Sequence, residues 1–347
     1  MVWIRGVALD WFRNYLSNRK QYVQYKNCKS SVHDILCGVP QGSVLGTLLF
    51  IIYTNDLPNC LKLSKTILFA DDTTMYLSSN NLTYLYNNIN EELDSLKDWF
   101  RANKLSLNVS KTNYVIFNNK NIIIPDQLKL KIGDELIELK NTVKFLGIYI
   151  DSKLDWHDHI KFIKNKLSSG NYAINRIKHL LSHKHLITLY YSLIYPYLDY
   201  GIILWGSTHT SYLKQIQIMQ KKVIRVISKA KYNDHTDPLF KKMNILKLED
   251  MYTLSVGKYI FSLNNGSLPS KLAQTAVINQ DVHSYNTRNK DYPHIQMRRT
   301  GTACRSNRYS GPTVWYNLPN EIKNLKRIKS FTNKLKKYCI CKYTEYA

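Results

Sequence analysis

The sequence GVPQGSVLGTLLFIIYTNDLP (Gly38–Pro58), followed by FADD (Phe69–Asp72), decides the fold of this chain. Two glycines flank Pro40 and Gln41, and this pattern predicts a rigid turn that another backbone can approach closely. Ser43 is a typical N-cap, so we expect a helix to begin there. Gln41 would then lie at a helix N-terminus, which favours phosphate. An ordinary strand–turn–helix junction has the same pattern, so both interpretations stay open.

Two strand-forming runs, Leu63–Phe69 and Thr73–Ser78, flank Asp71 and Asp72. They predict a β-hairpin with both carboxylates at its tip. Unpaired charge is costly to bury, and a hard cation with oxygen ligands would neutralise it, which favours Mg²⁺. Two such ions serve nucleotidyl transfer by stabilising the attacking and leaving oxygens. A solvated acidic turn is the alternative, because Asp is common in turns.

Hydrophobic periodicity predicts the remaining elements. The apolar stretch Val44–Tyr53 is about half as long as a membrane span, so it predicts a buried helix. Residues 264–312 are rich in Asn, Gly, Ser, Arg and Tyr and predict a loop or a weakly ordered connection. We expect helices over 3–16, 82–101, 160–181, 184–195, 211–229, 248–263 and 319–340, strands at 21–25 and 32–37, short strands over 113–150, and a hairpin of 128–132 with 136–139.

Positive charge is concentrated in the second part of the chain. The formal net charge is +24. Residues 1–155 hold 18 Lys and Arg against 15 Asp and Glu, whereas residues 156–347 hold 31 against 10. A polyanion such as nucleic acid is the natural partner of the basic part, because each neutralised phosphate releases counterions. A basic soluble domain without a ligand, or a surface for acidic membranes, is the alternative.

The six cysteines are too few and too scattered for a disulfide framework. Cys339 and Cys341 form a lone C-x-C without a second ligand pair, which argues against a zinc site. Charged residues interrupt the first twenty positions, so no signal peptide is expected. We therefore expect an intracellular protein with reduced thiols and no membrane association.

In their order and spacing, GVPQGSVLG (Gly38–Gly46) and FADD resemble motifs B and C of reverse transcriptases from non-LTR, LINE-type retrotransposons. NKLSLNVSKTNYVIF (Asn103–Phe117) is similar to motif D, and VKFLGIYID (Val143–Asp151) looks like motif E, the primer grip. Three further segments resemble the later part of jockey-like reading frames: Leu189–Gly206 with Leu213–Ile227, His283–Asn289, and Trp315–Cys339. The resemblance covers nearly the whole chain.

The resemblance implies roles around the two motifs. Asp71 would be a catalytic metal ligand, and Asp72 would be its neighbour at the same Mg²⁺ site. Pro40, Gln41 and Gly42 would lie against the template and the incoming nucleotide. The implied partners are an RNA template, a DNA primer and dNTPs.

Motifs D and E imply two further sites. Lys111 would lie near the leaving pyrophosphate, where a cation stabilises developing charge; an exposed structural lysine is equally consistent with the sequence. Phe145, Leu146 and Gly147 would hold the primer terminus. An apolar palm strand that ends at a glycine is the alternative for these three residues.

The sequence also departs from the family pattern. Reverse transcriptases carry a further catalytic Asp in motif A, before the helix that WIRGVALDWFRNYL (Trp3–Leu16) resembles, so we expect motif A and the fingers to be absent here. Asp10 would face solvent in mid-helix and would not substitute. Thr47 stands where the family commonly has Pro. Because only two carboxylates on one hairpin are present, we predict that this chain by itself does not catalyse DNA synthesis.

These observations predict an α+β fold. We expect a partial palm of antiparallel sheet and packed helices over 1–155, a helical thumb and connection over 156–263, and a basic C-terminal extension over 264–347. The predicted function is a fragment of an RNA-directed DNA polymerase. The alternative is a non-catalytic remnant that binds RNA or DNA through its basic half.

Overall fold

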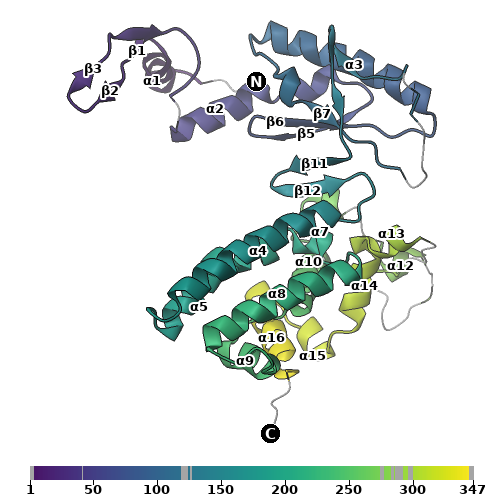
Figure 1. Cartoon of the computed structure of the whole chain (residues 1–347). Coiled ribbons are helices and arrows are strands. Elements are labelled where there is room, and N and C mark those ends of the chain that lie inside the picture. The colour runs from purple at the N-terminus through teal and green to yellow at the C-terminus, as the bar shows by residue number, and fades with distance from the viewer. Residues whose placement is uncertain are drawn as a thin grey trace. The chain divides into compact units, whose positions relative to one another are not determined.

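The computed structural model describes residues 4–40, 42–118, 124–125, 127–273, 277–282, 285, 292–295 and 300–343. It combines helices with small two-stranded sheets, as an α+β fold requires (Figure 1). The chain divides into two compact units. The first unit comprises Met1–Asn113 and Ile123–Glu138, and the second comprises Tyr114–Ile122 and Leu139–Ala347.

The first unit begins with a short helix and a β-ribbon. α1 (Val7–Leu16) has no buried residue. In the ribbon, β1 (Arg19–Gln21) pairs with β4 (His33–Ile35), and β2 (Gln24–Tyr25) pairs with β3 (Cys28–Lys29), both antiparallel. The predicted pairing of 21–25 with 32–37 is confirmed only in part, through β1 and β4, because Gln24–Tyr25 pairs with Cys28–Lys29, which lies between the two predicted strands.

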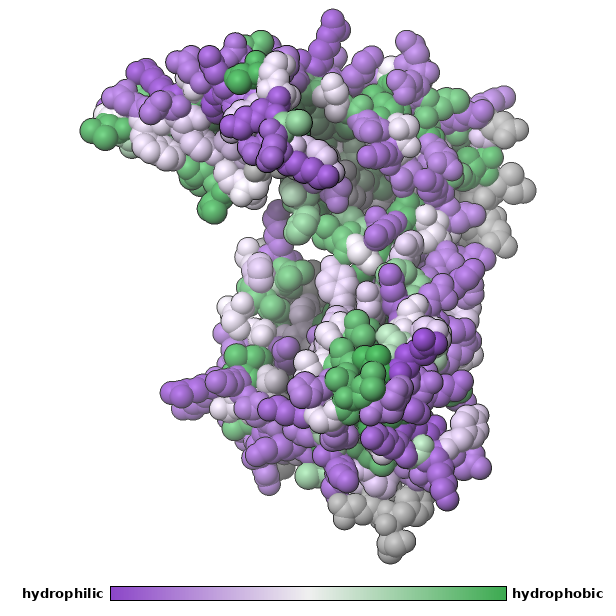
Figure 2. Space-filling model, turned by 60° about the vertical axis from the view of Figure 1, so that its left-hand side comes forward, coloured by the Kyte–Doolittle hydropathy of each residue, from purple (hydrophilic) through white to green (hydrophobic). Residues whose placement is uncertain are grey.

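Helix α2 (Val44–Thr54) starts where it was predicted but is not buried. Ser43 caps it, since Ser43 Oγ accepts a hydrogen bond from the Gly46 amide at 3.0 Å. Val44 is 90% exposed and Ile51 53% exposed. The expectation of a buried helix is wrong, because no described element of the first unit covers this apolar face. Figure 2 shows hydrophobic side chains (green) open to solvent among mostly hydrophilic ones.

The core of the first unit lies along α3 (Leu82–Ala102), where a helix was predicted. Its buried side chains include Tyr86 and Leu93, which share this core with Leu57 and Ile132. The surrounding elements are η1 (Leu57–Cys60), β5 (Lys65–Phe69), β6 (Asp72–Tyr76), η2 (Val109–Lys111), β7 (Asn113–Tyr114), β8 (Lys131–Ile132), β9 (Glu135–Leu136) and β10 (Glu138–Leu139). β8 pairs with β9 around Gly133, as the turn signal predicted.

Glu92 of α3 holds the loop that precedes β5. Its carboxylate accepts hydrogen bonds from the amides of Lys62, Leu63 and Ser64 at 2.6–2.9 Å, and from the Ser64 hydroxyl. Burial alone would raise the pKa of Glu92, but these hydrogen bonds outweigh it and lower the pKa. A charged side chain on the core face of α3 therefore satisfies the loop that leads into the hairpin.

The second unit opens with a hairpin of β11 (Thr142–Phe145) and β12 (Ile148–Asp151), followed by α4 (His157–Ile177). Asp151 joins them, because its carboxylate accepts hydrogen bonds from the amides of Lys153, Asp155 and Trp156 at 2.7–3.1 Å. α4 packs along α8, and its apolar period is confirmed by the burial of Ile163, Leu167 and Ile174 (Figure 1).

The remaining helices of the second unit follow the predicted order with one break. The helix expected over 184–195 ends at Leu193, and a second begins at Tyr195, because Pro196 lacks the amide needed to continue a helix. The elements are α5 (His183–Leu193), α6 (Tyr195–Asp199), α7 (Ile202–Trp205), α8 (Thr210–Ser228), α9 (Asp237–Met243) and α10 (Leu248–Asn264). The helices predicted over 211–229 and 248–263 are confirmed as α8 and α10.

A continuous core joins these helices, and a buried amide sits inside it. Gln220 Nε2 donates to the Tyr190 hydroxyl and to the Leu246 carbonyl, each at 3.0 Å. Gln220 Oε1 accepts from the Leu248 amide at 3.0 Å. Because each polar atom of this side chain has a partner, its burial is compatible with a stable core.

The C-terminal region is more helical than its composition predicted. Its elements are α11 (Ser270–Ala273), α12 (Asn279–Val282), α13 (Gly301–Cys304), α14 (Asn307–Tyr316), α15 (Asn320–Lys323) and α16 (Ile328–Cys341). The loop expected over 264–312 is wrong in its described part, because α14 packs on α10 and buries Trp315. Tertiary packing here overrides weak propensity. The final helix, expected over 319–340, forms as α15 and α16.

Candidate functional site

The tip of the β5–β6 hairpin carries the two predicted metal ligands. Phe69 pairs with Asp72, so Ala70 and Asp71 form the two-residue turn. Ala70 has a φ of 52°, a left-handed conformation that is strained for a residue with a Cβ. Asp71 and Asp72 are both exposed, and neither makes a hydrogen bond or ion pair with another described residue. Strain and unpaired charge thus meet at one short turn, a combination typical of functional positions.

Both carboxylates offer the oxygen ligands that suit a hard divalent cation. Within the described ranges, no group of three or more His, Cys, Asp and Glu side chains is placed to hold a metal ion. Asp71 and Asp72 by themselves would supply only part of the ligands that such an ion takes. The expectation that Asp10 faces solvent is confirmed: it lies in α1, its side chain is 72% exposed, and it pairs with Arg13 at 3.4 Å.

The turn before α2 is held by contacts that the sequence did not indicate. Arg19 donates hydrogen bonds to the carbonyls of Cys37 and Gly38. The Tyr15 hydroxyl donates to Ser43 Oγ at 2.8 Å. These contacts join residues far apart in sequence, so no local pattern could have predicted them. They fix both ends of the turn at the N-terminus of α2.

Within this turn, Gly38 and Gly42 each have a φ of 80°, which a side chain would disfavour. Pro40 is half-buried, and its carbonyl accepts a hydrogen bond from the Ser43 amide at 3.2 Å. Gln41 lies outside the described residues. The sequence prediction of a tight, glycine-dependent turn is therefore confirmed at its two glycines.

Lys111 lies at the end of η2 and is exposed. Its amide donates to Asn108 Oδ1 at 3.2 Å, so the backbone of this short helix is capped by a side chain. Because its ammonium group is exposed, this residue is compatible with a role in anion binding and with a structural role.

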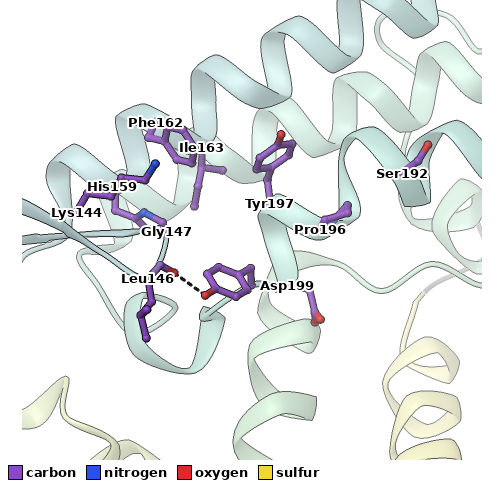
Figure 3. Close-up of a pocket in the computed structure, with 11 residues that line it drawn as sticks. Lys144, Leu146, Gly147, His159, Phe162, Ile163, Ser192, Pro196, Tyr197 and Asp199 are labelled. Carbon is purple, nitrogen blue, oxygen red and sulfur yellow. Dashed lines mark hydrogen bonds between the residues drawn. The ribbon is translucent and has the colours of Figure 1, made fainter. Parts of the chain in front are cut away.

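The turn between β11 and β12 lies in the second unit and contains the predicted primer-grip residues. Phe145 pairs with Ile148, and Leu146 and Gly147 form the turn with φ values of 45° and 85°. Two successive positive φ values are typical of a type I′ hairpin turn, which normally needs Gly or Asn. Leu146 is strained in this conformation. The Tyr200 hydroxyl donates to the Leu146 carbonyl at 2.5 Å and so holds the turn from outside (Figure 3).

A pocket of about 590 Å³ opens beside this turn. Figure 3 shows Phe162, Ile163 and Tyr197 around it, together with Leu146 and Gly147 of the turn. The remaining lining residues are Lys144, His159, Ser192, Pro196, Asp199 and Tyr200. Sequence reasoning did not indicate this pocket, because its walls come from separate elements.

A reverse transcriptase (RNA-dependent DNA polymerase) family model matches residues 4–150, which include both acidic and glycine-rich motifs. Residues 4–150 thus match the reverse transcriptase family. The RNA-directed DNA polymerase from mobile element jockey of Drosophila melanogaster is 28% identical over 299 residues, which cover 81% of this chain and 32% of that protein. The jockey polymerase of Drosophila funebris is 28% identical over 272 residues, 76% of this chain and 29% of that protein.

A third relative is the "Probable RNA-directed DNA polymerase from transposon X-element" of Drosophila melanogaster, 28% identical over 254 residues, 71% of this chain and 28% of that protein. The chain is thus similar to reverse transcriptases of non-LTR retrotransposons, as motifs B and C predicted. The chain spans about a third of the length of these relatives. No solved structure matches it significantly.

The described part of this chain contains no helix both long and apolar enough to cross a membrane. The structure brings Asp71 and Asp72 together on one turn, and Phe145, Leu146 and Gly147 together on another. What the sequence did not indicate is the support around them: Arg19 and Tyr15 at the first turn, and Tyr200 at the second.

Proposed function

We propose that this chain is part of an RNA-directed DNA polymerase that copies an RNA template from a DNA primer. The observation that carries the proposal is the pair Asp71 and Asp72, exposed and without partners among the described residues at a strained hairpin tip. In the complete polymerase these two carboxylates hold Mg²⁺. Bound Mg²⁺ supplies charge stabilisation for the attacking and leaving oxygens of nucleotidyl transfer.

The other site residues serve to place the substrates. Gly42 and Pro40, with Gln41, keep the turn before α2 open to the template and the incoming dNTP, since two positive φ values exclude bulky residues. Lys111 is an exposed cation available to the leaving pyrophosphate. Phe145, Leu146 and Gly147 form the grip on the primer, which Tyr200 holds in place.

In this proposal, residues 1–155 form a partial palm, residues 156–263 a thumb and connection, and residues 264–347 a C-terminal extension. The net charge of the part after residue 155 suits a strand of template or primer. The same part could bind nucleic acid without catalysis, but the likeness of the chain to polymerases over most of its length favours the polymerase.

Metal binding by the chain itself tests the proposal. We expect Mn²⁺, used as a paramagnetic substitute for Mg²⁺, to broaden NMR signals of residues around Asp71 and Asp72. Asp71→Asn should abolish this effect, whereas Asp34→Asn, at an exposed carboxylate of the same unit, should leave it unchanged. Broadening that persists in Asp71→Asn would contradict the metal-site assignment.

A primer-extension assay with Mg²⁺ tests the activity of the chain alone. We expect no template-dependent incorporation, because two adjacent carboxylates supply too few ligands to position two ions. Incorporation that Asp71→Asn removes would show that the two carboxylates suffice, and would overturn the predicted inactivity while supporting the polymerase.

A further inference from the structure

Apart from Tyr200, which holds the turn at Leu146, the tyrosine-rich segment 189–200 has no role in the proposed nucleotidyl transfer. Its five tyrosines differ in environment. Tyr190 is fully buried and bonded to Gln220, so its role is structural. Tyr197 is half-buried and Tyr200 is 54% exposed, and both line the pocket beside the turn at Leu146. The segment therefore presents aromatic rings to the one turn of the second unit to which we assign the primer.

The pocket has a size and a lining that suit one flat ring. Its volume of about 590 Å³ is typical of small-ligand sites. Phe162 and Tyr197 lie 6.2 Å apart between ring centroids, nearly perpendicular at 77°, and Pro196 and Ile163 add apolar surface. Aromatic side chains of this kind stack with nucleobases regardless of base identity.

Cations accompany the aromatic rings. Lys166 Nζ lies 5.6 Å from the ring centroid of Phe162 and 5.9 Å from that of Tyr197. Lys144, exposed on β11, lines the pocket directly. The carboxylate of Asp199 also lines it and accepts a hydrogen bond from the Tyr195 hydroxyl at 3.3 Å. The two ammonium groups suit the phosphates on either side of a bound base.

His159 is a buried residue in the wall of the pocket. Its Nδ1 accepts from the Tyr149 amide at 3.4 Å, so the proton of the neutral ring is on Nε2. The side chain is 3% exposed, and its Nε2 has no hydrogen-bond partner among the described residues. Burial lowers the pKa of His159 to about 4, so the ring is a neutral donor at neutral pH. An unpaired buried donor is costly, and less than 1 Å² of His159 Nε2 is exposed, so this atom lies beneath the wall of the pocket.

We propose that this pocket binds an unpaired nucleobase of the strand held at the Leu146–Gly147 turn, by stacking on Tyr197. The proposal rests on the proposed function, because it takes that turn as the primer grip. It adds a subsite that distinguishes an unpaired terminal base from a paired one. Tyr197 is the residue on which the preference depends most.

The test is binding of the full chain to two RNA–DNA duplexes that differ in one feature. In each, the DNA strand ends in a fluorescent adenine analogue, which is either paired or unpaired. We expect at least about fivefold tighter binding of the unpaired form, with quenching of its fluorescence, as base–aromatic stacking predicts. Tyr197→Leu should bring the two affinities to within about twofold of each other, whereas Tyr197→Phe should retain the preference.

Tyr191→Leu is the matched control, because Tyr191 is an exposed tyrosine of the same segment that does not line the pocket. It should retain the preference, and circular dichroism should match that of the unchanged chain in all three variants. One outcome is that the chain without substitutions binds both duplexes with equal affinity, and more weakly as the salt concentration rises. That result would overturn the proposed subsite but not the polymerase proposal. Loss of both affinities by the same factor in Tyr197→Leu would also overturn it. No affinity for either duplex would overturn both proposals.

Discussion

The two hairpins that carry the candidate site residues share a turn design but differ in support. Each closes with a two-residue turn in which a residue with a Cβ adopts a positive φ, Ala70 in one and Leu146 in the other. The turn at Leu146 is held by the Tyr200 hydroxyl, and β12 lies against α4. The turn at Asp71 has no comparable side-chain contact among the described residues of its unit. The turn to which we assign the primer is thus braced, and the turn to which we assign the metal is left open.

The same contrast extends to the two units. The second unit buries large side chains in one continuous core, including Trp205 and Phe331. The first unit has a smaller core along α3 and leaves the apolar face of α2 exposed. Since buried apolar area is the main source of stability, the second unit should contribute most of the stability of the chain.

Truncation of a core residue in each region should give the largest difference. Leu167→Ala in α4 should lower the free energy of unfolding by about 3 kcal/mol, because Leu167 is fully buried and leaves a cavity. Ile51→Ala in α2 should cost less than about 1 kcal/mol, since Ile51 is 53% exposed. Urea denaturation measures both. Similar losses in the two variants would show that the face of α2 is covered after all.

Acid should weaken the second unit through His159. The unfolded chain takes up a proton near its ordinary pKa of 6.5, whereas the folded ring does so only near pH 4. Stability is therefore unaffected above about pH 6.5 and falls as the pH drops toward about 4, by up to about 3 kcal/mol. His159→Asn should flatten this part of the pH profile, and His183→Asn, at an exposed histidine, should not. An unchanged profile in His159→Asn would refute the assignment.

Glu92→Gln should have a smaller effect, confined to the first unit. Loss of the charged acceptor should cost about 2 kcal/mol, because three amides and a hydroxyl converge on it. The lowered pKa means that this stabilisation is present above about pH 4.5 and is lost as the pH falls through the folded-state pKa. Glu91→Gln, at the exposed neighbouring position, should be neutral. Hydrogen exchange of the amides of Lys62 to Ser64 distinguishes this local loss from global unfolding.

Local signals predicted much of this fold. The Ser43 cap, the hairpin at Asp71 and Asp72, the turn at Gly133 and the period of α4 depend on neighbouring residues, and each is confirmed. The failures have tertiary causes. α2 is apolar but exposed because no described element of its unit packs over its apolar face, and α14 forms in a segment of weak propensity because it packs on α10.

The sequence by itself determined the family, since GVPQGS and FADD keep their order and spacing and need no structure to be read. It also placed the carboxylates on a turn, because strand alternation and turn chemistry are local. The tertiary structure alone decided how the turns are held, through Arg19, Tyr15 and Tyr200, and how Phe162, His159 and Tyr197 come to line one pocket. Contacts between distant residues depend on how the helices pack, and no local pattern of residues records that packing.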